Sequence, residues 1–589
     1  MPRTTLALTS FVSGEFSAKM DGRTDFDKYT SGVKTMENFL VHPQGSATRR
    51  VGTQHIAEVK DSTKKTRLIP FEFSTTQTYI LEFGDQYMRV YKDKGQVLSG
   101  GSPFEISTPF LEAELFDIKF AQSADVMYLC HPNHDVRKLS RTGHTAWTLA
   151  TVSFTGSPSL PISGANNRPS CVSFFEQRLV FANTITNPQT LWFSKAGDYE
   201  NFTTGTNADD AMIYTIASNQ VNAIQYLKAV RTLVVGTSGG EFTVSADGTD
   251  ASITPTNVTI KRQSSFGSAG VDAIPAGNAV LFLQKAKRKI RELAYNFDSD
   301  GYVAPDLTIL NDTVTKSGVN QMIFQQEPDS IIWCVRDDGV LAGLTYQRSE
   351  NVVAWHRHIF GGAFGSGNSV CESAASISGT LTEDELWVIV KRTINGATKR
   401  YVECFSDFDF DETTATDFKF LDSHLNYSGS ATTTLSGLSH LEGQTVSILA
   451  DGSVHANKTV SSGSITLDRS VTKACVGLAY DSVLQTMRIE GGAAEGTSQG
   501  KTKRISKVVL RLFETVGVKV GPSLDQLETV PFRTTSSNLS APVDTLLAGD
   551  KEIEFRDDYN SDGFIFIKQD QPLPCSVLAI YPTVVTSDG

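Results

Sequence analysis

Few residues of this chain stand at spacings that catalysis requires. The stretch GTSGG (Gly236–Gly240) matches the G-x-S-x-G motif of serine hydrolases, whose serine needs a sharp turn from a strand into a helix. Here LVV precedes the motif and EFTVS follows it, so a second strand is predicted and Ser238 is interpreted as a turn residue. The sequence shows no dinucleotide fingerprint, phosphate-binding loop or catalytic dyad, and no catalytic residue is predicted.

Two histidine pairs have the spacing of metal ligands. His131 and His134 stand in HPNH at a proline-containing turn, and His356 and His358 stand in WHRH on one face of a predicted strand. Neither pair has a neighbouring acidic or cysteine residue of clear metal-binding type. Both pairs are therefore interpreted as structural.

Two loops begin like calcium-binding loops, NFDSDG (296–301) and DYNSDG (558–563). The twelfth position of such a loop needs a bidentate glutamate, and these loops place Leu307 and Gln569 there. They are interpreted as turns between strands, and no metal or cofactor is predicted.

Basic clusters are the remaining candidates. Arg49 and Arg50 follow a turn in HPQGSATRRVGT, and arginine makes forked bonds to carboxylates and carbonyls, so we interpret them as structural or inter-subunit braces. Solvated turn arginines are the alternative. KAKRKIR (285–291) and KTKRISK (501–507) are interpreted as solvated hairpin tips, with contacts to an acidic subunit or to DNA phosphate as alternatives. The predicted interface residues are Arg49, Arg50, Lys287, Arg288, Lys289 and Arg504.

Composition limits what these residues can do. The chain has 589 residues, too many for one hydrophobic core, and a formal net charge of −12, which disfavours sequence-independent DNA binding. Its seven scattered cysteines include no CxxC pair and predict buried thiols. No stretch is apolar enough for a signal peptide or a membrane span.

The elements that must position these residues are strands. A short N-terminal helix is expected within TDFDKYTSGVKTMENF (24–39). From about residue 65 onward, paired apolar strands recur about every 50 residues, marked by Ile80, Val126, Leu179, Leu233, Val280, Ile331 and Leu386. Meanders at this interval are typical of propeller blades. The sequence thus predicts a mainly β protein with an irregular β-propeller-like body.

Four domains are predicted. Residues 1–64 form a helix-turn segment, and residues 65–405 form six or seven blades. An acidic connector (405–422) leads into a small β-barrel or sandwich module within 406–505. Residues 506–589 are expected to close the body.

Several phrases resemble one known family, the tail nozzle proteins of short-tailed bacteriophages, also called tail tubular protein B. They are SGEFSAKMDGRTDFDKYTSGVKTMENF, HPQGSATRRVGT, WFSKAGDYENF, TPTNVTIKRQSSFGS, YVAPDLTIL, DDGVLAGLTYQRSENVVAWHRH and CVGLAYDSVLQT. The resemblance implies a structural virion protein, made in the host cytoplasm, with no enzymatic activity. It implies a homohexameric nozzle that holds an adaptor ring, neighbours fibres or spikes, and conducts genomic DNA without sequence-specific binding.

Two other functions stay open at this point. A propeller-type receptor- or glycan-binding tail protein would need an exposed groove rich in aromatic residues. A propeller hydrolase would need converging carboxylates. The five tryptophans fall mostly in strand patterns, which indicates a core: Trp147, Trp192, Trp333, Trp355 and Trp387.

Overall fold

The computed structural model describes residues 3–217, 220–248, 251–379, 383–407, 415–491, 497–532 and 546–587. Strands dominate these residues, so the predicted mainly β fold is confirmed. The described helical turns are short 3-10 segments: η1 (Ala18–Met20), η2 (Asp27–Ser31), η3 (Glu112–Asp117), η4 (Arg348–Glu350), η5 (Ala415–Asp417) and η6 (Ser439–Leu441). No helix in the described ranges is long and apolar enough to cross a membrane.

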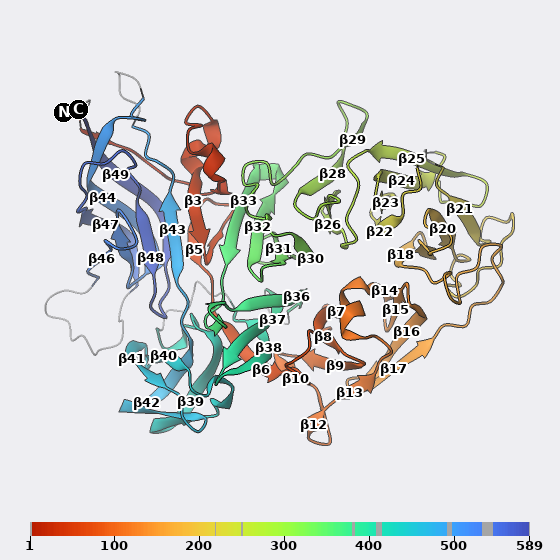
Figure 1. The fold of residues 1–589 in the computed structure, drawn as a ribbon, viewed down its shortest axis with the longest axis horizontal. Coiled ribbons are helices and arrows are strands. Elements are labelled where there is room, and N and C mark those ends of the chain that lie inside the picture. Colours follow the sequence, from red (N-terminus) through yellow and green to blue (C-terminus); the bar gives the residue numbers. More distant parts are fainter. Residues whose placement is uncertain are drawn as a thin grey trace.

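Seven antiparallel units stand in a ring around a common axis (Figure 1). We number them as blades 1 to 7, each with its strands in order from the axis outward. Blade 1 contains β7 (Arg67–Ser74), β8 (Gln77–Gly84), β9 (Tyr87–Lys92), β10 (Gly95–Gln96) and β13 (Glu105–Ser107). Blade 2 contains β14 (Lys119–Ser123), β15 (Val126–His131), β16 (His134–Gly143) and β17 (Ala146–Thr151). Blade 3 contains β18 (Cys171–Phe175), β19 (Arg178–Ala182), β20 (Thr190–Phe193) and β21 (Met212–Thr215).

The remaining blades repeat this order. Blade 4 contains β22 (Ile224–Ala229), β23 (Leu233–Thr237), β24 (Gly240–Ala246) and β25 (Val258–Ser264). Blade 5 contains β26 (Ile274–Ala276), β27 (Ala279–Leu283), β28 (Ile290–Asn296) and β29 (Gly301–Val303). Blade 6 contains β30 (Val319–Gln325), β31 (Ile331–Arg336), β32 (Leu341–Gln347) and β33 (Val352–His358). Blade 7 contains β36 (Val370–Ser378), β37 (Asp384–Ile394), β38 (Ala397–Phe405) and β6 (Thr53–Glu58). Two small hairpins pair β11 (Leu98–Ser99) with β12 (Ser102–Pro103), and β34 (Ala363–Phe364) with β35 (Gly367–Asn368).

Apolar side chains fill the space between each pair of neighbouring blades. Seven hydrophobic clusters each join two consecutive blades, and the seventh joins blade 7 back to blade 1 through Ile80 and Trp387. A four-stranded blade cannot cover its own two faces, so radial stacking is what gives each blade a core. The predicted propeller-like body is confirmed, and its ring is closed.

The ring is closed by a strand from the N-terminal part of the chain. Strand β6 pairs antiparallel with β38 as the outermost strand of blade 7. On the inner side β36 lies beside β7, where the Leu68 amide donates to Ser373 Oγ at 3.0 Å. The first and last blades are therefore joined by side-chain contacts and by the chain itself, which runs from β6 in blade 7 to β7 in blade 1.

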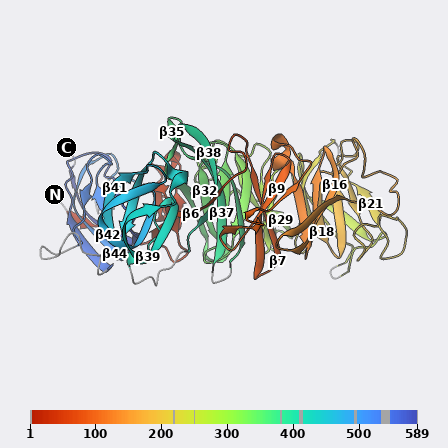
Figure 2. The ribbon, with the colours of Figure 1, turned by 90° about the horizontal axis from the view of Figure 1, so that it is seen from below.

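Strands from both chain ends form a second region, which we call the terminal module. One sheet contains β1 (Arg3–Thr5), β4 (Phe39–Val41), β5 (Ala47–Arg49), β44 (Thr502–Thr515), β47 (Leu547–Glu554) and β49 (Ser576–Ser587). Its other strands extend the sheet of blade 6: β2 (Gly14–Glu15), β3 (Gly32–Glu37), β43 (Ser482–Thr486), β45 (Lys519–Gly521), β46 (Glu528–Thr529) and β48 (Phe566–Gln569). One apolar core joins the two sheets, and the module lies beside the propeller along the long axis (Figure 2).

Two predicted elements are wrong. The expected helix within 24–39 is a short 3-10 turn, η2, followed by β3, because tertiary pairing with β43 outweighs the helical spacing of the apolar residues. The expected barrel or sandwich module is instead a set of four strands that continues the sheet of blade 7 beyond β6. These strands are β39 (Asp422–Ser436), β40 (Thr445–Ala450), β41 (Ser453–Thr459) and β42 (Ser464–Leu478).

The division into four domains stays a prediction. Part of the expected acidic connector, residues 408–414, lies outside the described residues.

Candidate functional site

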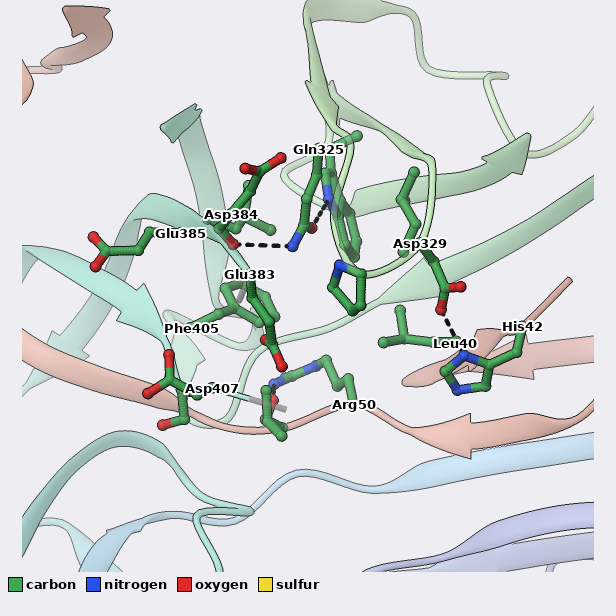
Figure 3. Close-up of a pocket in the computed structure, with 16 residues that line it drawn as sticks. Leu40, His42, Arg50, Gln325, Asp329, Glu383, Asp384, Glu385, Phe405 and Asp407 are labelled. Atoms are coloured by element: carbon green, nitrogen blue, oxygen red, sulfur yellow. Dashed lines mark hydrogen bonds and ion pairs between the residues drawn. The ribbon is translucent and has the colours of Figure 1, made fainter. Parts of the chain in front are cut away.

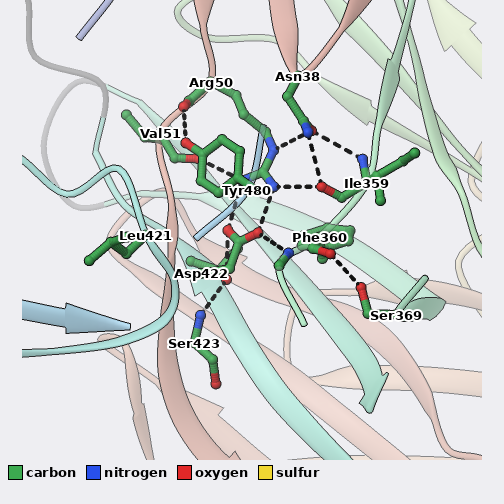
Figure 4. Close-up of polar contacts among 12 residues, drawn as sticks. Asn38, Arg50, Val51, Ile359, Phe360, Ser369, Leu421, Asp422, Ser423 and Tyr480 are labelled. Atoms are coloured by element: carbon green, nitrogen blue, oxygen red, sulfur yellow. Dashed lines mark hydrogen bonds and ion pairs between the residues drawn. The ribbon is translucent and has the colours of Figure 1, made fainter. Parts of the chain in front are cut away.

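Arg50 is the centre of the joint between the propeller and the terminal module (Figure 4). Its guanidinium is fully buried and donates to both carboxylate oxygens of Asp422 at 2.8 and 2.6 Å. The Nε donates to Asn38 Oδ1 at 2.9 Å, and the Tyr480 ring centre lies 3.8 Å from the guanidinium carbon. Burial acts to lower the pKa of Arg50, but Asp422 outweighs it and holds the pKa above its usual value.

Arg49 is also buried, and it binds backbone carbonyls. Its Nη1 donates to Leu573 O at 2.9 Å and to Gln571 O, and its Nη2 donates to Tyr480 O at 2.9 Å. Burial is the main cause that lowers the pKa of Arg49. Arg49 is the last residue of β5, so these hydrogen bonds tie the end of β5 to the segment that leads into β49.

This burial decides between the two roles predicted for the arginine pair. Arg49 and Arg50 are 1% and 0% exposed, and every partner named above belongs to the same chain. The pair acts as a brace within one chain and offers no surface to a second chain. The inter-subunit role and the solvated-turn alternative are both corrected on this ground.

The other predicted interface residues lie at the surface. Arg288 and Lys289 are exposed and Lys287 is half-buried in the turn between β27 and β28, and Lys289 Nζ lies 3.1 Å from Asp306. Arg504 is exposed on β44. Their role in an interface stays a prediction.

Most of the motifs with catalytic or metal-ligand spacing lie on turns between strands. Ser238 lies in the turn between β23 and β24, so the chain continues into a strand and not into a helix. His356 and His358 are buried on β33, with Nδ1 of the first 2.6 Å from Nε2 of the second. The two calcium-like loops connect β28 to β29 and precede β48.

A pocket of about 50 Å³ lies where β4, blade 6 and blade 7 meet (Figure 3). Its carboxylates are bound to groups of the chain itself. Asp329 Oδ2 lies 2.6 Å from His42 Nδ1, Glu385 accepts from Trp387 Nε1 at 2.9 Å, and Asp384 accepts backbone amides of the loop before β31. The pocket is a structural joint in which the acidic groups orient loops.

A larger cavity of about 260 Å³ lies on the propeller axis. Its wall comes from the innermost strands or adjoining loops of blades 1, 2, 4, 5, 6 and 7. Phe116, Phe120, Phe324 and Met322 supply apolar surface. A concave site with an apolar wall and a few polar groups is the usual form of a ligand pocket.

Four charged residues line this central cavity. Arg67, Lys119 and Lys228 carry positive charge and Asp272 carries negative charge, so the wall has a formal charge of 3 − 1 = +2. Lys119 Nζ donates to Gly270 O at 2.8 Å and lies 2.9 Å from Asp272 Oδ1. The cavity is therefore positive inside a protein whose net charge is −12.

The three cations differ in how well they are paired. Arg67 Nη1 donates to the carbonyls of Leu115 and Ile118, both at 2.8 Å. The Lys228 ammonium makes no hydrogen bond or ion pair within the part of the chain that the structure describes. Burial lowers the pKa of Lys228, partly offset by the charge of Asp272. The Lys228 ammonium is thus available to an anion that enters the cavity.

Burial alone would raise the pKa of Asp272, but Lys119 and Arg67 outweigh it and hold the pKa below its usual range. The Asp272 side chain is 45% exposed, which shows that solvent reaches the cavity. Sequence reasoning missed all four charged residues, because they are isolated along the chain and only the ring brings them together. The one available signal was their place at or near the first strand of each repeat.

The chain was compared with known proteins. No family model matches it, and no curated protein matches it. Among solved structures it is similar to the Cps50 (Swd1) β-propeller domain of Myceliophteria thermophila, at 9% identity and a TM-score of 0.36, covering 60% of this chain and 99% of that one. It is also similar to the Pan2 WD40 domain of Neurospora crassa (9%, TM-score 0.36, covering 62% and 96%) and to the RRP9 WD40 repeats (8%, TM-score 0.39, covering 61% and 100%).

These comparisons correct the resemblance drawn from the sequence. The structures reported above are β-propeller domains, two of them named as WD40, and no tail nozzle protein is among them. No family model or curated protein matches either, so the assignment as a tail nozzle protein and the location in a virion are wrong. The expected homohexamer, adaptor ring, fibres or spikes and conducted DNA are without support. At these TM-scores the neighbours say nothing of function, and the propeller assignment follows from the strand pairing of this chain.

Proposed function

We propose that this protein is a binding protein without catalytic activity, and that its propeller receives an anionic group of a partner protein in the central cavity. The observation that carries the proposal is the unpaired ammonium of Lys228 in a cavity of about 260 Å³ with a formal charge of +2. Carboxylates are the commonest anionic groups that a partner protein presents. The position of Ser238 in a hairpin turn supports the absence of a hydrolase site.

The positive charge of the cavity within an acidic chain supports an acidic segment as the ligand. An acidic partner is repelled by a chain of net charge −12, so it binds only where the local potential is reversed. The cavity provides that reversal, and its wall places apolar side chains next to the charged groups, which strengthens the attraction relative to open solvent. A glycan ligand is less favoured, since all five tryptophans are buried.

Fluorescein-labelled hexaglutamate is a direct probe, read by fluorescence anisotropy against hexaglutamine. We expect hexaglutamate to bind, hexaglutamine not to bind, and affinity to fall as salt rises. Lys228→Met should weaken binding at least ten-fold, which corresponds to about 1.4 kcal/mol.

Lys261→Met is the matched control, because Lys261 is exposed on β25 of the same blade. It should leave hexaglutamate binding unchanged. Equal losses in the two variants would place binding on the outer surface, and the absence of hexaglutamate binding would reject an acidic ligand.

A further inference from the structure

Glu114, His131 and His134 meet at the junction of blades 1 and 2. Each offers one ligand atom, and the three atoms lie within 4.8 Å of one another. The two histidines face each other across the turn that joins β15 to β16, and Glu114 comes from η3, which leads into blade 2. The glutamate lies 17 residues before the first histidine, which is why sequence spacing did not connect them.

Existing contacts already gather these three side chains. His134 Nε2 lies 2.7 Å from Glu114 Oε2, and Asn133 Nδ2 donates to Glu114 Oε1 at 2.9 Å. The Leu111 amide also donates to Glu114 Oε2 at 3.0 Å. The chain therefore holds this carboxylate in place beside the two imidazole rings.

His131 has an unsatisfied nitrogen at this place. The residue is 2% exposed, its Nδ1 accepts the Asn133 amide at 3.1 Å, and its buried Nε2 has no hydrogen-bond partner. A buried polar atom without a partner is uncommon and asks for an explanation such as an ion.

We propose that Glu114, His131 and His134 form a binding site for a divalent transition metal, with Zn²⁺ as the ion that fits best. Two imidazoles and one carboxylate are a known three-residue ligand set for zinc, which leaves a fourth position for water. Ligand atoms about 2.1 Å from a tetrahedral ion lie roughly 3.4 Å apart. The widest pair, at most 4.8 Å apart, therefore needs to close by up to about 1.4 Å, and the His134–Glu114 pair, now 2.7 Å apart, needs to open by about 0.7 Å.

Binding changes the proton positions in a defined way. The ion takes the place of the proton that His134 Nε2 shares with Glu114, and that proton moves to Nδ1 of the same ring, so the imidazole stays neutral. Ligation through Nε2 of His131 places the ring proton on Nδ1 and releases the Asn133 amide. Two hydrogen bonds are thus exchanged for three metal bonds, and the metal ties η3 to the hairpin of blade 2. The side chains of Glu114 and His134 are 14% and 19% exposed, which leaves a route for the ion from solvent.

The test uses the full chain, freed of metal by a chelator and kept reduced so that its cysteines stay thiols. Titration with Zn²⁺ against a fluorescent chelator should give one equivalent bound with a submicromolar dissociation constant, together with a higher melting temperature. Failure to bind one equivalent would overturn the proposal.

Variants locate the site. Glu114→Gln keeps the shape of the side chain and removes its charge, and His134→Gln removes one ring, so each should weaken Zn²⁺ binding by about 100-fold or more. His144→Gln is the control, because His144 is an exposed histidine of the same blade outside the cluster. Unchanged Zn²⁺ binding in Glu114→Gln and His134→Gln would reject these ligands.

Cobalt substitution gives a readout that does not depend on stability. Co²⁺ bound by nitrogen and oxygen ligands in tetrahedral geometry has visible absorption bands. We expect the bands in the native chain and in His144→Gln, and their loss in His134→Gln. Bands that persist in His134→Gln would place the ion elsewhere.

Discussion

Arg50 and Lys228 are both cations held inside the same chain, and their surroundings differ in one respect. Arg50 has a carboxylate, carbonyl and amide oxygens and an aromatic face around it, whereas Lys228 has no partner among the described residues. Burial alone therefore does not separate a structural charge from a binding charge. The number of satisfied bonds does, because an unpaired charge next to open volume is the one that gains from a ligand.

The largest expected effect comes from breaking the Arg50 joint. Arg50→Ala leaves the buried carboxylate of Asp422 without its partner, and we expect a loss of about 3–5 kcal/mol in the free energy of unfolding. Arg50→Lys should be nearly as harmful, because lysine lacks the planar fork. Urea unfolding measures both variants. Arg288→Ala, at an exposed position, should stay within about 0.5 kcal/mol, and a similar value for Arg50→Ala would refute the joint.

Lowering the pH should reduce the free energy of unfolding by a smaller amount, through a histidine at the same joint. His424 is fully buried on β39, and burial is the main cause that lowers its pKa to about 4. The unfolded chain takes up this proton near pH 6.5 and the folded chain does not, so stability falls between pH 6.5 and about 4, by about 1.4 kcal/mol per pH unit.

His424→Gln should remove that dependence, about 2 kcal/mol of the loss between pH 7 and pH 5. The measurement is the difference between unfolding free energies at the two pH values. His144→Gln, at an exposed histidine, should keep the dependence of the parent chain. An unchanged slope in His424→Gln would mean that this histidine is already charged when folded.

The smallest expected effect concerns the cavity and has the opposite sign. Lys228→Met removes an unpaired, partly buried ammonium, so we expect stability to rise by up to about 1 kcal/mol. Lys119→Met removes the partner of Asp272 and should lower stability instead. Thermal unfolding of both variants checks this pair, and a loss of stability in Lys228→Met would show that Lys228 is held by the chain and not reserved for a ligand.

The local pattern of strands could be predicted from the sequence, because it depends on neighbouring residues. Ile80, Val126, Leu179, Leu233, Val280, Ile331 and Leu386 each lie on the second strand of a different blade. Alternating apolar residues and turn residues are enough to locate such strands.

Contacts between distant segments could not be predicted in this way. Arg50 and Asp422 are 372 positions apart, and the extension of blade 7 by β39 depends on which sheet edge is free. The cavity residues and the cluster of Glu114 with two histidines have the same origin: the ring assembles them from different repeats. The resemblance to tail nozzle proteins rested on short phrases of turns and strands, and such phrases specify local structure and not a function.

The closing strand also has a consequence during protein synthesis. Strand β6 pairs with β38, and their partner residues Thr53 and Phe405 are 405 − 53 = 352 positions apart. At about 5–20 residues per second, a ribosome needs roughly 20–70 s to make the intervening chain. For that interval β6 has no edge to pair with, and an open strand edge is where chains aggregate or exchange strands. Ring closure is therefore a late event for the nascent chain, and a slower ribosome would lengthen the period in which two growing chains could trade this strand.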